Sequence, residues 1–203
     1  MWYMEILLIR HGQSQANLEG IVQGNMDSPL SATGIQQARK LQQFLPQTYD
    51  HIYSSPLRRA LDTALLAMDL AENSPVLTLD PRLEEIGFGG LQGISYKKVP
   101  FPREDVKMHL SMVFDKFQEQ YGAESLANFF TRTRRAFDDI VTQMVLHQHR
   151  RVLVFCHGGV LRSILQHYLQ LTSGRFDNTE IARLQLTKMG WQLERLTSHI
   201  GPV

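Results

Sequence analysis

Short runs of continuous apolar residues alternate along this chain with segments in which apolar residues recur at helical spacing. The runs typical of buried strands are EILLI, HIYS, PVLTL and RVLVFC. The helical patterns lie in GIQQARKLQQFL, in SSPLRRALDTALLAMDLA, at 125–146 and in VLRSILQHYLQL. Strands that are apolar on both faces are typical of a parallel sheet covered by helices on either side. The alternation therefore predicts an α/β fold, a three-layer α/β/α sandwich with a mostly parallel central sheet.

A single domain is expected over residues 1–203, because this length is enough to bury a substantial core. Between about 87 and 122 the alternation breaks into the glycine-rich GFGGLQG, the proline-containing KKVPFPRE and an amphipathic segment. We interpret this stretch as a helical insertion that caps the carboxyl edge of the sheet. The last apolar runs, EIARLQL and WQLERL, are expected to close the sheet as a hairpin that turns at Met189-Gly190.

Charge and cysteine content narrow the classes of partner. The formal net charge of +1 supplies no global field for nucleic acid or an anionic membrane, so neither is expected as a partner. The one cysteine, Cys156, lies in an apolar strand and is expected to serve packing, and no Cys/His spacing predicts a metal site. The N-terminal apolar run is too short to span a membrane and lacks the features of a secretory signal, which favours a cytoplasmic protein.

Two of the predicted strands end in the same way. ILLI runs into Arg10-His11-Gly12, and VLVFC runs into His157-Gly158-Gly159. Ligands of open α/β sheets bind beyond the carboxyl ends of the strands, where helix N-termini offer N–H groups to anions. If the two strands are neighbours, both imidazoles face one anion site, although a single histidine after a strand is more often structural.

Arg59 stands against the local preference of its predicted helix. With Ser55 as N-cap and Pro56 at the first helical position, the arginine falls in the first turn, where a cation opposes the helix dipole. Such a placement suggests a bound anion. A salt bridge to Asp62 or Glu85 explains it equally well from the sequence.

Six motifs resemble, in order and spacing, those of the histidine phosphatase superfamily, whose best-known branch is the cofactor-dependent phosphoglycerate mutases. They span about residues 5–182 and read LIRHGQSQAN, GNMDSPLSATGIQQA, IYSSPLRRALDTA, RLEEIGFGGLQG, GAES and VFCHGGVLR. The resemblance implies that His11 is the nucleophile that becomes phosphohistidine. It implies that the pocket around the phosphoryl oxygens consists of Arg10, Arg59 and His157.

The resemblance also assigns the acid and the substrate contacts. In RLEEIGFGG the matching acid is Glu85, which leaves Glu84 as a solvated neighbour. The positions that resemble those touching the phosphate or positioning the nucleophile are Asn17, Gln23, Gly24 and Gly158.

These residue types suit phosphoryl transfer without a metal. A neutral imidazole nitrogen attacks phosphorus in line when fixed cations screen the phosphate, and arginine forks bind phosphate in a bidentate way without deprotonating. A carboxyl group protonates the leaving alkoxide and then activates the water that cleaves phosphohistidine. We therefore expect no metal or other cofactor, and a small phosphomonoester as the partner.

The same pocket serves a phosphatase and a mutase. The phosphoglycerate mutases resembled here carry a longer insertion with an arginine pair that grips the substrate carboxylate, whereas this chain offers single cations such as Lys97, Lys98 and Arg103. These cations fit a second anion site, but we favour a solvated loop. We favour a metal-independent phosphomonoesterase. The alternatives are a mutase, with 2,3-bisphosphoglycerate as primer, and a scaffold without catalysis; the physiological substrate and the oligomeric state stay open.

Overall fold

The central sheet of the computed structural model has the strand order β3-β2-β4-β1-β5-β6. The structure describes residues 4–99, 118–171 and 176–197. The strands are β1 (Met4–Arg10), β2 (His51–Ser54), β3 (Leu77–Leu79), β4 (Arg151–Cys156), β5 (Ile181–Thr187) and β6 (Gly190–Thr197). The first four are parallel, β5 is antiparallel to β1, and β6 is antiparallel to β5. The predicted mostly parallel sheet, closed by a C-terminal hairpin, is thus confirmed.

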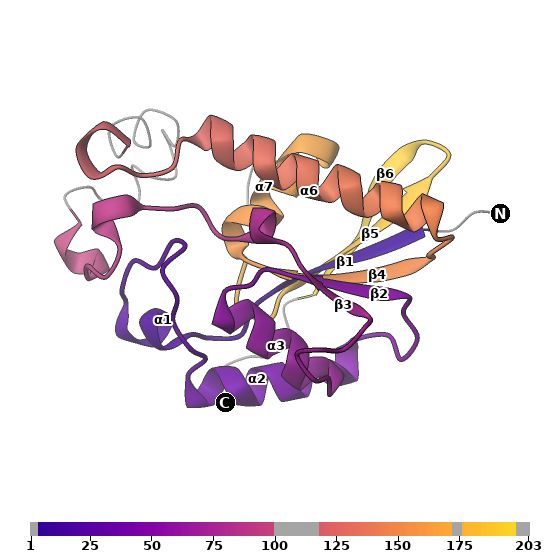
Figure 1. Ribbon diagram of the computed structural model, residues 1–203, viewed down its shortest axis with the longest axis horizontal. Coiled ribbons are helices and arrows are strands. Elements are labelled where there is room, and N and C mark those ends of the chain that lie inside the picture. Colours follow the sequence, from indigo (N-terminus) through magenta and orange to yellow (C-terminus); the bar gives the residue numbers. More distant parts are fainter. Residues whose placement is uncertain (1–3, 100–117, 172–175, 198–203) are drawn as a thin grey trace.

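Helices cover both faces of the sheet, as the three-layer prediction requires (Figure 1). The α-helices are α1 (Gln15–Glu19), α2 (Ala32–Leu41), α3 (Arg58–Met68), α6 (Leu126–Leu146) and α7 (Gly158–Leu169). The 3-10 helices are η1 (Gln42–Phe44), η2 (Pro81–Leu83), η3 (Gly89–Leu91) and η4 (Tyr96–Lys98). α2 and α3 pack on one face, and α6 and α7 on the other. Within the described ranges no helix is long and apolar enough to cross a membrane.

The burial of β1 explains its unbroken apolar sequence. Ile6 and Leu8 join the core beneath α6 and α7, whereas Leu7 and Ile9 join the core beneath α2 and α3. All four side chains are fully buried, and each contributes roughly 1.5–3 kcal/mol to stability. A strand packed on both faces gives a rigid support to the residues that follow it.

The start of α3 differs from the prediction. The helix begins at Arg58 after Leu57, which makes no side-chain cap, so the prediction of Ser55 as N-cap with Pro56 at the first helical position was wrong. The buried Ser55 hydroxyl is bonded to Nε2 of His157 (2.8 Å) and accepts the N–H of Leu57 (3.3 Å). This side chain therefore makes a tertiary contact instead of capping the helix.

The other element boundaries move by a few residues at most. α6 begins after its N-cap Ser125, as predicted. α2 begins at Ala32, two residues before the predicted pattern, because the hydroxyl of Ser31 accepts the N–H of Gly34 (3.0 Å) and caps it. The hairpin turns at 188–189, one residue before the predicted position.

The predicted insertion at about 87–122 is described only in part. Residues 100–117, and with them Arg103, lie outside the described residues, so the insertion as a whole stays a prediction. Its first part, 87–99, pairs with the loop after α1: the N–H of Val22 donates to the carbonyl of Ile94 (2.9 Å), and the N–H of Gly93 donates to that of Val22 (2.9 Å).

Candidate active site

The carboxyl ends of β1 and β4 bring the two predicted histidines together. The strands are parallel neighbours, with Arg10 opposite Cys156, and the N–H of His11 donates to the carbonyl of Cys156 (3.0 Å). The ring centroids of His11 and His157 lie 5.1 Å apart at an interplanar angle of 59°. Both side chains are buried. The condition set by the sequence, that the two strands be adjacent, is met.

His11 is held in one tautomer by its own turn. Its Nδ1 lies 2.6 Å from the carbonyl oxygen of Gly12. A carbonyl oxygen only accepts, so Nδ1 carries the proton and Nε2 carries the lone pair. Burial, followed by the charges of Arg59 and Arg10, lowers the pKa of His11 well below its usual range. The imidazole is therefore neutral at physiological pH, with Nε2 available as a nucleophile.

Arg59 is a buried cation that main-chain carbonyls hold in place. Its side chain is 1% exposed, Nη1 donates to Met26 (2.9 Å) and Nη2 to Gly24 (2.6 Å). Burial lowers the pKa of Arg59 to about 10, so it stays charged at neutral pH. Its Nε is buried with no hydrogen-bond partner among the described residues. Asp62 pairs instead with Arg58 (2.6 Å), so the structural salt bridge to Asp62 is not formed.

His157 directly follows β4 and is the N-cap residue of α7. Its Nε2 is bonded to Ser55, while its Nδ1 is buried and finds no partner in the described part of the chain. Burial, then Arg59 and His11, lowers the pKa of His157 well below its usual range. Two buried nitrogens, Nδ1 here and Nε of Arg59, thus lack a partner among the described residues, and each would be satisfied by a polar ligand within reach.

Arg10 is anchored by the segment that precedes β5. Its Nη1 donates to the carbonyl of Phe176. A Cβ built on Gly158 would lie 3.6 Å from Arg10 Nε, so the first residue of α7 lies directly against the guanidinium. The first turn of α7 and the Arg10 guanidinium are therefore neighbours.

Glu85 reaches the same helix N-terminus from the loop after η2. Its Oε2 accepts the N–H of Gly159 (2.9 Å), and its Oε1 accepts the N–H of Ile86 (3.0 Å). A Cβ on Gly159 would lie 2.1 Å from Oε1, so only glycine leaves room for the carboxylate here. The structure thus brings Glu85 to the end of α7 that follows His157. Glu84, predicted to be solvated, is half-buried, and burial raises its pKa.

The predicted contacts Asn17, Gln23 and Gly24 support the site from the segment around α1. Oδ1 of Asn17 accepts the N–H of Ser14 (3.2 Å), and Oε1 of the buried Gln23 accepts the hydroxyl of the same serine (2.7 Å). The carbonyl of Gly24 holds Arg59, and its φ of +55° favours glycine. Their contact with a phosphate stays a prediction.

The sequence did not predict the contacts that four residues make around His11 and His157: Ser55, Thr63, Asn178 and Thr179. The hydroxyl of Thr63 accepts the N–H of Gly12 (3.0 Å) and donates to the carbonyl of Arg59 (2.6 Å). Asn178 donates to the carbonyl of His11 (3.0 Å), and the buried Thr179 adopts a φ of +62° that is rare for a β-branched residue. Only Ser55 had a usable signal, since HIYS ends at the same sheet edge.

The other residues considered in the sequence are two lysines and the single cysteine. Lys97 and Lys98 on η4 are exposed. Cys156 is buried, and burial raises its pKa, which agrees with the prediction of inert packing.

Known proteins resemble this chain in sequence and in structure. The model of the histidine phosphatase superfamily (branch 1) matches residues 6–199. A metal-independent phosphoserine phosphatase of Arabidopsis thaliana is 30% identical over 204 residues, 98% of this chain and 84% of that protein. Phosphoglycerate mutase-like protein 4 of the same plant is 33% identical over 166 residues, 81% of this chain and 70% of that protein. The fold matches phosphoglycerate mutase from Bacillus anthracis with a TM-score of 0.83 at 24% identity, over 95% of this chain and 92% of that one.

Proposed function

The chain belongs to the histidine phosphatase superfamily, and we propose that it is a metal-independent phosphomonoesterase that hydrolyses a small phosphorylated metabolite through a phosphohistidine at His11. The observation that carries this proposal is the state of His11. Its Nδ1–H donates to the carbonyl of Gly12, and its ring is neutral. Its Nε2 has no hydrogen-bond partner among the described residues, and two arginines and a second histidine lie nearby. This is the arrangement that an in-line attack on phosphorus needs.

In the first step Nε2 of His11 attacks the phosphorus, an N–P bond forms, and the ester P–O bond breaks. Arg10, Arg59 and His157 bind the phosphoryl oxygens and stabilise their charge in the transition state. Glu85 gives its proton to the alkoxide that leaves. The alcohol departs and phosphohistidine remains.

In the second step water attacks the same phosphorus. Glu85, now a carboxylate, takes a proton from the water, the N–P bond breaks, and the electron pair returns to Nε2. Inorganic phosphate leaves, and the enzyme regains its starting state. The cations that serve the first transition state serve the second without rearrangement.

Two observations favour water over a sugar or glycerate hydroxyl as the acceptor. The stretch after GGLQG carries no arginine pair, and Lys97 and Lys98 are exposed. The A. thaliana relative that aligns over almost the whole chain is named a metal-independent phosphoserine phosphatase, which supports hydrolysis without a metal. A small phosphomonoester is therefore the proposed partner, in the cytoplasm and without nucleic acid.

The test is one incubation with two readouts. The protein, with a chelator present, receives O-phosphoserine, sugar phosphates, or 3-phosphoglycerate with a catalytic amount of 2,3-bisphosphoglycerate, and both free phosphate and phosphoglycerate isomers are followed. His11→Ala is the inactive variant, and His147→Ala, at an exposed histidine, is its matched control. We expect phosphate release that only His11→Ala abolishes. Isomer exchange with little phosphate release would make the protein a mutase, and silence in both channels would favour a scaffold.

A further inference from the structure

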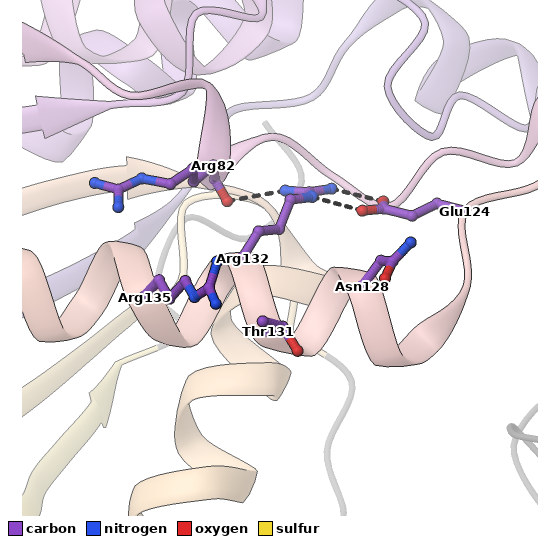
Figure 2. A pocket seen from close by; sticks show the side chains of 6 residues that line it. All are labelled: Arg82, Glu124, Asn128, Thr131, Arg132 and Arg135. Atoms are coloured by element: carbon purple, nitrogen blue, oxygen red, sulfur yellow. Dashed lines mark hydrogen bonds and ion pairs between the residues drawn. The ribbon is translucent and has the colours of Figure 1, made fainter.

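Arg132 of α6 holds together the loop that carries Glu85. Its Nη1 donates to the carbonyl oxygens of Arg82 (2.8 Å) and Glu84 (2.7 Å), and its Nη2 donates to the carbonyl of Glu85 itself (3.1 Å). Figure 2 shows the guanidinium between the Arg82 carbonyl and the carboxylate of Glu124. A single side chain thus fixes three main-chain carbonyls at and just before the acid.

Glu124 orients Arg132 and reaches the loop as well. Nε and Nη2 of Arg132 donate to Oε1 (2.6 Å) and Oε2 (2.8 Å) of Glu124, a bidentate pair. Oε2 also accepts the N–H of Gly87 (3.2 Å), and the N–H of Glu124 donates to the carbonyl of Gly87 (2.7 Å). The pair is largely shielded from water, with side-chain exposures of 23% and 20%, so its charge-assisted bonds are only partly screened. The loop is therefore fastened after Glu85 as well as before it.

The GAES motif at 122–125 gains a role from this arrangement. Its Ser125 caps α6 by accepting the N–H of Asn128 (3.1 Å), which fixes where the helix begins. Glu124 immediately precedes that cap, and Arg132 lies on the helix that the cap starts. The motif therefore sets both members of the pair relative to the loop, although none of its residues takes part in the proposed chemistry.

We propose that Arg132, oriented by Glu124, is a positioning residue that sets the place of the Glu85 carboxylate at the N-terminus of α7. The inference rests on the proposed function, in which Glu85 is the general acid. Proton transfer requires the carboxyl group within hydrogen-bond distance of the leaving oxygen. A loop that relaxes by about 1 Å is expected to cost about 100-fold in rate.

The choice of leaving group separates a positioning role from a structural one. An alkoxide needs the proton of Glu85, whereas p-nitrophenolate leaves without one, so the two esters report acid catalysis and overall integrity separately. We expect Glu85→Gln to lower kcat/KM on an alkyl ester by about 100-fold, and on p-nitrophenyl phosphate by less than about 5-fold. Arg132→Ala should show the same selectivity. Arg135→Ala is the matched control. This exposed arginine lies on the same helix (Figure 2) and makes no hydrogen bond or ion pair with the described residues of the loop, so its loss should leave both activities unchanged.

Chemical rescue gives a second readout on the same variants. A cavity of about 270 Å³ adjoins the pair, lined by Arg82, Glu124, Asn128, Thr131, Arg132 and Arg135 (Figure 2). Because Arg132→Ala enlarges an open cavity, guanidinium chloride at millimolar concentration should restore part of its alkyl-ester activity. It should not restore Glu85→Gln. Arg132→Lys, which keeps the charge and loses the fork, should fall between the wild type and Arg132→Ala.

Each failure has its own signature. Equal losses on both esters, or no loss, in Arg132→Ala and Arg132→Lys would overturn the positioning role while Glu85→Gln still shows selectivity. If Glu85→Gln itself lacks selectivity, the acid of the proposed function is wrong, and the role of Arg132 falls with it. If Arg132→Ala does not fold, Arg132→Lys and Glu124→Gln provide the same comparison, and uniform losses in both would also refute the proposal.

Discussion

Gly159 gives the Glu85 carboxylate its room, and Gly159→Ala should inactivate the protein without unfolding it. The added Cβ would lie 2.1 Å from Oε1 and 3.2 Å from Oε2 of Glu85. Contacts under 3.0 Å are essentially never seen, so the carboxylate must retreat by about 1 Å, and a misplacement of that size costs about 100-fold in rate, or about 2.7 kcal/mol in the barrier.

The stability of the same variant should hardly change. The clash meets the far end of a flexible side chain and leaves the backbone alone. Alanine is also a better helix former than glycine, by up to about 1 kcal/mol. We expect the Tm to differ from the wild type by less than about 4 °C. A loss of activity with the fold intact is the signature of a displaced group.

The assay measures phosphate release from an alkyl phosphate at subsaturating substrate, together with a thermal scan of each protein. Gly90→Ala is the control, because its Cβ meets the nearest atom, the carbonyl of Tyr121, at an ordinary 3.6 Å; neither rate nor Tm should change. If Gly159→Ala keeps more than half of the wild-type kcat/KM, the carboxylate does not act from the place seen here. If the Tm falls in step with the rate, the glycine is needed for folding alone.

Three further changes test other parts of the structure. Glu5→Gln breaks the ion pairs that a fully buried carboxylate makes with two arginines, and it should lower the free energy of unfolding in urea by about 2–3 kcal/mol. Glu194→Gln, at an exposed position, should not. Equal effects of the two substitutions would refute the role of the buried pairs. Because the pKa of His11 is lowered, its neutral, nucleophilic form persists when the pH falls below 6.5, the ordinary histidine pKa. We therefore expect kcat/KM on p-nitrophenyl phosphate, corrected for ionisation of the substrate, to be unchanged down to about pH 5.5. A fall in kcat/KM with an apparent pKa of about 6.5 would contradict this. Ser55→Ala leaves Nε2 of His157 without its partner and should cost about tenfold in kcat, and an unchanged kcat would show that the ring needs no such support.

The strand ends account for what the sequence predicted well. One apolar run ends in Arg10-His11 and a second one ends in His157, which indicated these residues as candidates for a site. The parallel pairing of the two runs agrees with strands that are buried on both faces. The identity of Glu85 came only from the resemblance, because the loop after η2 has no periodicity that would place it. The apolar pattern of the strands thus predicts where their carboxyl ends lie, and the order of the motifs predicts which loop packs against them.

The residues that hold the candidate site residues in place could not be predicted from local sequence patterns, because they come from remote parts of the chain. Asn178, in the connection before β5, donates to the carbonyl of His11, and Arg132 of α6 donates to the carbonyl of Glu85, 47 residues earlier in the chain. Ser55 was misread because a serine before a proline and a helix fits an N-cap, and only the neighbouring β4 shows that its hydroxyl is bonded to His157. Such contacts depend on which strands are adjacent, which periodicity does not encode.

Two buried charged residues, Glu5 and Arg59, show how a structural charge can be distinguished from one that binds a ligand. Glu5, fully buried in β1, has both carboxylate oxygens bonded to arginines, so its charge is compensated within the protein. Arg59 is equally buried, opposes the dipole of α3 and keeps an Nε without a partner in the described structure. Burying this cation is costly even though the charges of Glu85 and Asp27 favour it, and a bound anion lowers that cost further. Arg59, which is unfavourable at its helix position, is therefore the residue on which phosphate binding is expected to depend.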